Sequence, residues 1–405
     1  MGTLKATERV PPRVHTERRA LPAVGHRSRM LAVLSLGWAV LQCGRFLLPP
    51  LLPRIQATLA LSAAEAGLAL TAFGLVYAVV QYPSGAYSDT LSRASLILPG
   101  FAVLVAGFVV LGVGPSVPLF IVGLALVGVG KGLFASPSRA LLGDLFSGTR
   151  GRALGLYSAG TDLGGVLAAG LSVAVLSTTW RLAFVPVAVV LAAVTALFVY
   201  WNREPYTVGS VGLSPWATVR RIAATPTQRE VLVAYSLFYF VVGGFVNFLP
   251  TMLVARGVVP PALASGSFAL LFLVGLVAKP AAGEVSDRIP RPAVGAVALV
   301  VAAIGIAVVL RAGSPVGVVA GTLLAAAGYK TQFPVSDAIV MDAAPDGNVG
   351  GDLGAARAVF LLANALGPGF VGIVAEYADY TVAFWSLAGL FVLSGLVLLG
   401  QYRSR

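Results

Sequence analysis

The chain has 405 residues, of which 58% belong to the apolar set and only 11% are charged, and its mean hydropathy is +0.89. An ordinary soluble domain carries about 25% charged residues, so this composition indicates an integral membrane protein. The single cysteine, Cys43, excludes an internal disulfide, and the only two histidines lie in a basic N-terminal segment, which argues against Cys/His zinc chemistry. The net charge of +12 is not clustered on one soluble face, so nucleic-acid binding is not indicated.

The first half of the chain begins with residues 1–29, which are basic and lead directly into a full-length apolar segment. We expect this segment to be a cytoplasmic tail rather than a signal peptide. A helix needs about 20 apolar residues to cross the hydrocarbon core of a bilayer. Residues 30–201 contain six such windows, at about 30–53, 63–86, 94–114, 117–141, 153–177 and 180–201.

The second half follows a polar linker, residues 202–228, and occupies residues 229–402. It contains six further windows, at about 229–254, 262–286, 292–312, 315–341, 353–377 and 380–402, and residues 403–405 form a short tail. We therefore predict an all-α membrane protein with twelve transmembrane helices in two six-helix bundles.

The basic residues predict the orientation of these spans. An even number of spans places both termini on one side, and 18 of the 22 basic residues outside the spans fall on that side. The positive-inside rule assigns this side to the cytoplasm. We expect a multi-pass protein of the cytoplasmic membrane with both termini and the linker inside.

The two halves repeat each other. Residues after the second span recur 198 positions later after the eighth, with the same spacing: Gly85, Asp89 and Arg93, then Gly283, Asp287 and Arg291. Lys131 and Lys330 repeat at an offset of 199. Two pseudo-symmetric bundles place a binding site between the halves, near the middle of the membrane.

This repeated loop resembles the signature of the major facilitator superfamily, and the resemblance extends from about Arg29 to Arg403. In that family a Gly is followed four residues on by an Asp, and four beyond that by a basic residue. The resemblance implies that the Asp faces the N-terminal end of span eleven. It also implies that the basic residue pairs with an acid at the cytoplasmic end of span four, which is Asp144 here, and Asp342 in the second half.

The same charges suggest a cytoplasmic gate without reference to the family. A carboxylate and an arginine one turn apart at a helix end can latch the two halves only while that side is closed. Arg139 and Asp337 occupy nearly equivalent positions, so they are candidates for a further ion pair across the halves. The simpler alternative is that these charges only fix the topology.

Four charged residues are expected at the depth of a central cavity. A charge in the middle of a bilayer costs about 2.5 to 3.5 kcal/mol on insertion scales, so such residues usually face a cavity. Arg45, Lys131 and Lys330 against Asp162 leave a surplus of about two positive charges. Either the site binds an anion or one lysine is deprotonated by desolvation, and we favour the anion. Asp162 is a candidate proton carrier, because burial disfavours the charged carboxylate unless a cation such as Lys131 or Lys330 neutralises it.

The function that we predict is secondary active transport of a small organic or inorganic anion by alternating access. Four further side chains are expected to complete the substrate site: Tyr77, Gln81, Tyr239 and Asn247. No cofactor is implied, the expected coupling ion is H+, and the expected working unit is a monomer. The alternative is proton-coupled export of neutral or cationic amphiphiles, with Lys131 and Lys330 as internal partners of Asp162 and Asp337.

Two departures make the drug exporters of the superfamily the less favoured comparison. Those exporters usually carry an Arg early in span four, and residues 121–126 contain none. Their G-P-x-x-G-G signature in span five survives only as residues 160–165, with Thr161 in place of the Pro. Catalytic motifs such as G-x-S-x-G and H-E-x-x-H do not occur, so an enzyme is not expected.

Overall fold

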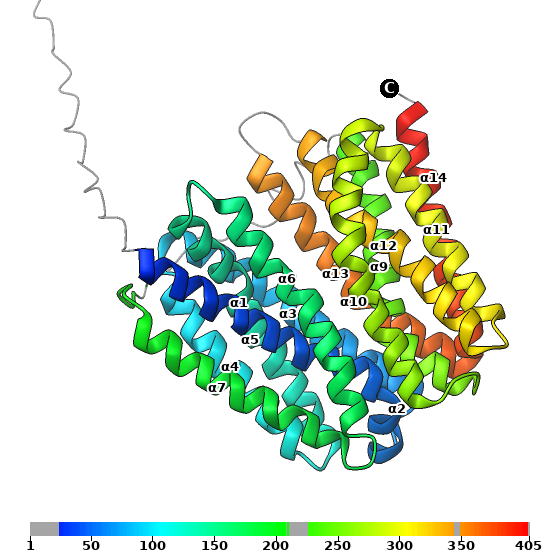
Figure 1. Ribbon diagram of the computed structural model, residues 1–405, viewed down its shortest axis with the longest axis horizontal. Coiled ribbons are helices and arrows are strands. Elements are labelled where there is room, and N and C mark those ends of the chain that lie inside the picture. Colours follow the sequence, from blue (N-terminus) through cyan, green and yellow to red (C-terminus); the bar gives the residue numbers. More distant parts are fainter. Residues whose placement is uncertain (1–23, 208, 210–225, 344–348, 404–405) are drawn as a thin grey trace, which may run out of the picture.

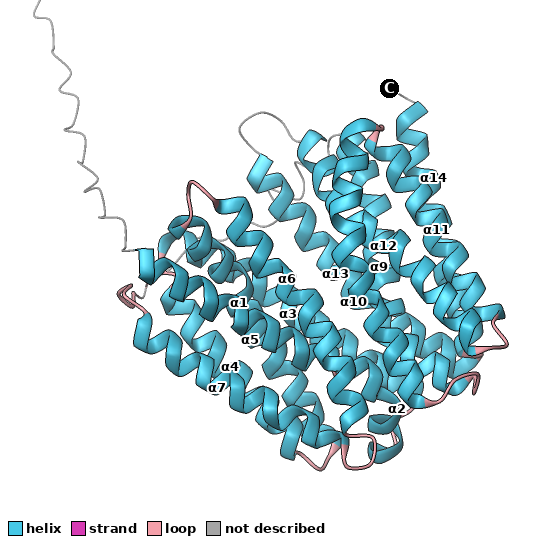
Figure 2. Ribbon diagram, in the orientation of Figure 1, coloured by secondary structure: helices cyan, strands magenta, loops and turns pink. Residues whose placement is uncertain are grey.

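The structure is a computed structural model that describes residues 24–207, 209, 226–343 and 349–403, and every regular element within these ranges is a helix (Figure 1, Figure 2). Most of the predicted tail, residues 1–23, and much of the predicted linker, residues 208 and 210–225, lie outside the described residues.

The first bundle is drawn in blue to green in Figure 1. Its elements are α1 Val24–Phe46, α2 Leu48–Leu59, α3 Ala63–Thr90, α4 Ala94–Val113, α5 Val117–Leu145, α6 Arg150–Ala174, the 3-10 turn η1 Trp180–Ala183 and α7 Phe184–Trp201. The second bundle runs from green to red. Its elements are α9 Pro226–Ala255, α10 Pro261–Arg288, α11 Arg291–Arg311, α12 Pro315–Ala343, α13 Val349–Tyr377 and α14 Tyr380–Arg403.

These helices confirm the predicted all-α fold of two six-span bundles, with α1 and α2 together making the first span. Ten helical stretches in the described residues are long and apolar enough to cross a membrane. The two that fall short are α6 and α12, because glycines and polar residues such as Asp162 and Lys330 lower their hydropathy. These two helices contribute their polar side chains to the cavity between the bundles.

The first span departs from the prediction in one respect, since its helix is interrupted at Leu47. Two prolines, Pro49 and Pro50, follow directly and begin α2, and proline is tolerated in a first helical turn because its missing N–H would be unpaired there. The span then continues to Leu59, several residues beyond the predicted end. Arg54 therefore lies within α2, where it donates to the carbonyl oxygens of Val175, at 2.7 Å, and Thr178.

The bundles lie closest together on the side away from the chain termini, which we call the distal side. We call the side where α1 begins and α14 ends the terminal side. On the distal side α3 and α13 touch backbone to backbone, because a Cβ added to Gly67 would lie 2.5 Å from the carbonyl oxygen of Pro368. On the terminal side, a Cβ at Gly85 or Gly283 would meet nothing within 4 Å.

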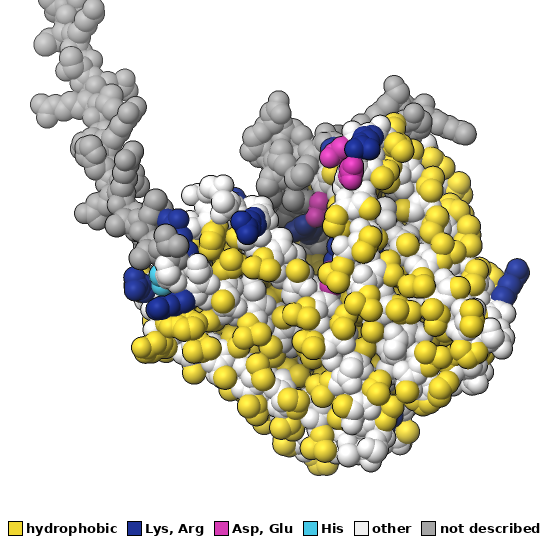
Figure 3. Space-filling model, in the orientation of Figure 1, with side chains coloured by type: hydrophobic (Ala, Val, Ile, Leu, Met, Phe, Trp, Pro, Cys, Tyr) yellow, Lys and Arg dark blue, Asp and Glu magenta, His cyan; other side chains and the backbone are white. Residues whose placement is uncertain are grey.

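The surface reflects the same asymmetry. In Figure 3 apolar side chains cover the flanks of both bundles, while most of the charged side chains in view gather toward the terminal side. The surface is hollowed between the bundles on that side, and basic and acidic side chains are visible inside the hollow. The site of interest is therefore a cavity between the halves that opens toward the termini.

Candidate functional site

The cavity between the bundles has a volume of about 460 Å³, within the usual range of small-molecule sites. Its walls come from α1, α3, α5 and α6 of the first bundle and from α9, α10, α12 and α13 of the second. Both halves therefore contribute side chains to one site, as expected for a pseudo-symmetric pair of bundles.

The structure places six of the seven predicted substrate residues in the cavity wall. They are Arg45, Tyr77, Lys131, Tyr239, Asn247 and Lys330. The seventh, Gln81, lies outside the cavity lining. It is one helical turn beyond Tyr77, where α3 packs against α5, since a Cβ added to Gly132 would be 3.2 Å from the Gln81 backbone nitrogen.

Three basic side chains of the first bundle face the cavity without an acidic partner among the described residues: Arg45, Lys131 and Arg139. Each lies against an aromatic ring instead. The Lys131 ammonium is 4.0 Å from the centre of the Tyr77 ring, the Arg45 guanidinium 4.6 Å from that of Phe46, and the Arg139 guanidinium 5.1 Å from that of Trp38. A cation over an aromatic face gains about 0.5 to 2 kcal/mol, which is less than burial of an unpaired charge costs.

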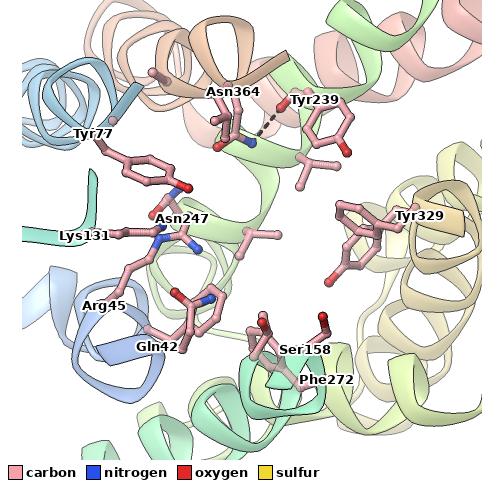
Figure 4. A pocket seen from close by; sticks show the side chains of 18 of the residues that line it. Gln42, Arg45, Tyr77, Lys131, Ser158, Tyr239, Asn247, Phe272, Tyr329 and Asn364 are labelled. Carbon is pink, nitrogen blue, oxygen red and sulfur yellow. Dashed lines mark hydrogen bonds between the residues drawn. The ribbon is translucent and has the colours of Figure 1, made fainter. Parts of the chain in front are cut away.

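Two of these cations converge on one spot. Figure 4 shows Arg45 and Lys131 pointing toward Asn247, beneath Tyr77, and Arg45 is close enough to both Lys131 and Tyr77 to interact with them electrostatically. Lys131 is only 5% exposed. Like charges at close range repel each other, so this corner of the cavity is suited to an anion.

Gln42 also belongs to this corner, although the sequence analysis did not single it out. It lies three residues before Arg45 on α1, so both side chains share a helix face. Its side-chain oxygen is buried without a hydrogen-bond partner in the described structure. The sequence signal that would have identified it is an amide side chain three residues before an arginine within the same predicted span.

On the opposite wall, one carboxylate of the first bundle is held by two lysines of the second. Asp162 on α6 accepts from Lys279 on α10, at 2.5 Å, through Oδ2 and from Lys330 on α12, at 2.9 Å, through Oδ1. The side chains of Asp162 and Lys330 are 4% and 5% exposed, whereas that of Lys279 is 31% exposed. The three residues therefore form an ion-pair cluster across the boundary between the halves.

This cluster contains one of the two lysines expected beside Asp162, and a further lysine that was not expected there. The prediction named Lys131 or Lys330 as the cation that neutralises the carboxylate, and in the structure it is Lys330 and not Lys131. Lys279 is the second partner. Lys279 was not predicted to take part in the site. Because a charge within a span is costly unless it faces a cavity, its position in the sequence would have been enough to include it.

The cavity carries more positive charge than the sequence count of four residues gave. Among the described residues, five basic side chains and one acidic side chain, that of Asp337, line it, which leaves a surplus of four. The expected surplus of two counted Asp162, which lies beside the cavity and not in its lining, and did not count Arg139, Lys279 and Asp337.

The predicted gate charges on the terminal side are partly brought together. The Arg93 Nε atom lies 3.3 Å from Asp144 Oδ2, as the family resemblance implies, and Arg291 lies 3.7 Å from Asp287 one turn before it on the chain. The side chains of Asp89 and Asp342 lie outside the described residues.

The expected ion pair between Arg139 and Asp337 is not formed in this state. Asp337 is held by Arg357 of its own bundle through two hydrogen bonds, of 2.5 and 3.2 Å. A planar guanidinium fork fits a carboxylate in this bidentate way. Arg139 lies over Trp38 instead.

The distal side is held closed by polar contacts between the halves. Glu376 at the end of α13 accepts from the backbone N–H groups of Ala63, at 3.0 Å, and Ala64, at 3.4 Å, at the start of α3. A carboxylate at a helix N-terminus satisfies unpaired donors and interacts favourably with the helix dipole. Two turns further along, Thr71 accepts from the backbone N–H of Gly369 at 2.8 Å.

Two helical bundles around a charged cavity that is closed on one side define a membrane carrier. The model of the Major Facilitator Superfamily matches residues 34–310 and 259–404, and the chain belongs to this superfamily. It is therefore a multi-pass secondary transporter and not an enzyme, which confirms the family, fold and general function predicted from sequence.

Known proteins resemble the chain over most of its length. It is 23% identical over 381 residues to the hexuronate transporter of Bacillus subtilis, covering 86% of this chain and 88% of that protein. A bacterial homologue of the human lysosomal transporter Spinster, in an inward-facing and occupied conformation, superimposes with a TM-score of 0.82 at 18% identity, covering 95% and 98% of the two chains. The human organic anion transporter MFSD10 gives a TM-score of 0.69 at 21% identity, with 92% and 99% covered.

Proposed function

We propose that this transporter moves a small organic anion across the cytoplasmic membrane by alternating access. The observation that carries the proposal is a set of cavity cations that have no acidic partner within the described part of the chain: Arg45, Lys131 and Arg139. A desolvated cation without a partner is costly, and a bound anion supplies the missing charge. The guanidinium of Arg45 can hold a carboxylate through two hydrogen bonds, with Lys131 beside it as a second cation.

The nature of the relatives supports an organic anion. Hexuronates are sugar acids with one carboxylate, and the substrates named for the human neighbour are organic anions. The aromatic and amide groups near the cations, among them Tyr77, Tyr239 and Asn247, offer surfaces and hydrogen bonds for the rest of such a molecule.

The proposed working cycle starts from the state described here, in which the site opens to the cytoplasm and the distal side is sealed. This assignment rests on the positive-inside rule for the direction and on the close packing of α3 against α13 for the seal. We propose that the chain works as a monomer and that its coupling ion is a proton carried by Asp162.

The proposal is tested by ligand-induced thermal shift on the purified protein, since a ligand that binds only the folded state raises the unfolding temperature. D-glucuronate and benzoate are compared with their uncharged counterparts, glucose and benzamide. We expect shifts from the two acids only, and expect Arg45→Gln and Lys131→Gln to reduce them at least tenfold in apparent affinity. The matched control is Arg311→Gln, since Arg311 also lies against an aromatic ring, that of Trp385, but outside the cavity lining.

A second candidate function is export of neutral or cationic amphiphiles. It is favoured by the aromatic part of the lining, such as Phe272, Tyr329 and Phe333, and by the internal pairing of Lys330 with Asp162. A thermal shift with hydrophobic cations and none with the two acids would select this function and reject the anion.

A further inference from the structure

We propose that Lys279 and Lys330 form a carboxylate subsite that Asp162 occupies in this state, and that a second carboxylate of the substrate, beyond the one held by Arg45 and Lys131, displaces Asp162 from it. This inference rests on the proposed transport of an organic anion and names the part of the substrate that the second bundle recognises. Asp162 is then a tethered internal competitor of the substrate.

The geometry of the cluster is that of a carboxylate held by two cations. Each oxygen of Asp162 accepts from a different lysine, at 2.5 and 2.9 Å. Both lysines belong to the second bundle, on α10 and α12, whereas the carboxylate comes from α6 of the first. The two ammonium groups are therefore already spaced to hold the two oxygens of one carboxylate.

Lys330 has supports of its own that do not depend on Asp162. The Lys330 ammonium lies 4.5 Å from the centre of the Phe272 ring and 5.3 Å from that of Tyr329. The glycine at position 275 leaves space for the carboxylate. A Cβ at this position would lie 3.0 Å from Asp162 Oδ1 and 3.1 Å from Lys330 Cδ. The subsite is thus a feature of the second bundle into which a carboxylate fits.

The charge balance favours exchange of the occupant. One carboxylate serves two cations, so the cluster keeps a net positive charge that attracts a second anion. Asp162, Lys279 and Lys330 lie beside the cavity, and both lysines are part of its lining. The one acidic side chain among the described residues of that lining, Asp337, is held by Arg357 and does not compete for the lysines.

Exchange of carboxylates would couple binding to movement of the halves. The pairs of Asp162 with the two lysines join the bundles directly. When one carboxylate of the substrate takes this place and the other lies against Arg45 and Lys131 of the first bundle, the join between the bundles passes through the substrate. The bundles are then free to change their angle only with substrate bound between them.

The test compares affinities for two dicarboxylates, D-glucarate and terephthalate, measured by thermal shift against ligand concentration on full-length variants. We expect Asp162→Asn to lower the Kd at least tenfold, because the internal competitor is lost. We expect Lys279→Gln and Lys330→Gln each to raise the Kd at least tenfold. The matched control is Asp337→Asn, which removes the same charge from the same cavity but leaves both lysines with their carboxylate, and should change the Kd less than threefold.

Three results would overturn the subsite. They are weaker or unchanged binding in Asp162→Asn, an equal gain in Asp162→Asn and Asp337→Asn, and wild-type affinity in both lysine variants. If Asp162→Asn does not fold, the two lysine variants decide the matter alone. Failure of the proposed function looks different, because neither the wild type nor Asp162→Asn would then bind either acid. Binding that depends on Arg45 and Lys131 but not on the two lysines would reject only the subsite.

Discussion

Two glycines of α3 allow a direct test of alternating access. Gly67 lies on the sealed distal side, where an added Cβ would be 2.5 Å from the Pro368 carbonyl oxygen and 3.0 Å from the Gly372 Cα atom. Gly85 lies on the open terminal side, where an added Cβ would meet nothing. Gly67→Ala should therefore disfavour the observed state, whereas Gly85→Ala should leave it undisturbed and hinder only the state in which the terminal side closes.

The expected size follows from these contacts. The atoms near Gly67 belong to backbone, which cannot turn aside, so the helices must separate, and overpacking of this kind costs about 1 to 3 kcal/mol. At a factor of ten for each 1.4 kcal/mol, the balance between the two states shifts by about 5-fold to 150-fold. The gain of about 1 kcal/mol from replacing a helical glycine by alanine applies to both states and to both variants, because the helix persists throughout.

The assay is cysteine labelling of the cavity. Ser158 lines the cavity and is exposed to it, so Ser158→Cys on a Cys43→Ser background reports opening when a membrane-impermeant maleimide is added from the terminal side. We expect Gly67→Ala to slow labelling about 5-fold or more. Gly85→Ala should keep labelling at or above the reference while transport falls. Equal effects of the two substitutions, or faster labelling in Gly67→Ala, would refute the assignment of the open and sealed sides.

Three further predictions concern topology and the two gates. A Tyr206→Cys variant should react with an impermeant maleimide only from the cytoplasm, because Tyr206 is exposed in the described part of the linker, and labelling from outside would reject the orientation. Glu376→Gln should weaken the distal seal by about 1 kcal/mol and reduce terminal-side labelling. The control, Glu65→Gln, removes a cap of the same helix within one bundle, so it should lower thermal stability without changing the labelling. Identical labelling in the two variants would count against the seal. Asp89→Asn and Asp287→Asn should each raise terminal-side accessibility, and unchanged transport and accessibility in both would discard the latch.

The hydropathy of the sequence and its internal duplication were sufficient to predict the architecture. Each predicted span lies on one helix, on the pair α1 and α2, or on η1 and α7 together, because a segment that must satisfy its backbone inside a bilayer has little choice but to be helical. The repeat of Lys131 in Lys330 also predicted that both would line one cavity, since equivalent positions in two related bundles face the same axis. These features are local, or repeat along the chain, and so can be predicted from sequence.

The pairing of charges was decided only by the tertiary structure. Asp162 is 117 residues from Lys279 and 168 from Lys330, and nothing in the sequence distinguishes these lysines from Lys131 as partners. The choice depends on the angle between the bundles, which brings α6 against α10 and leaves Lys131 on the far wall beside Arg45. The same angle leaves Arg139 apart from Asp337 in this state. In a protein that changes this angle as it works, which charges meet is a property of the conformation, and the order of residues alone does not determine it.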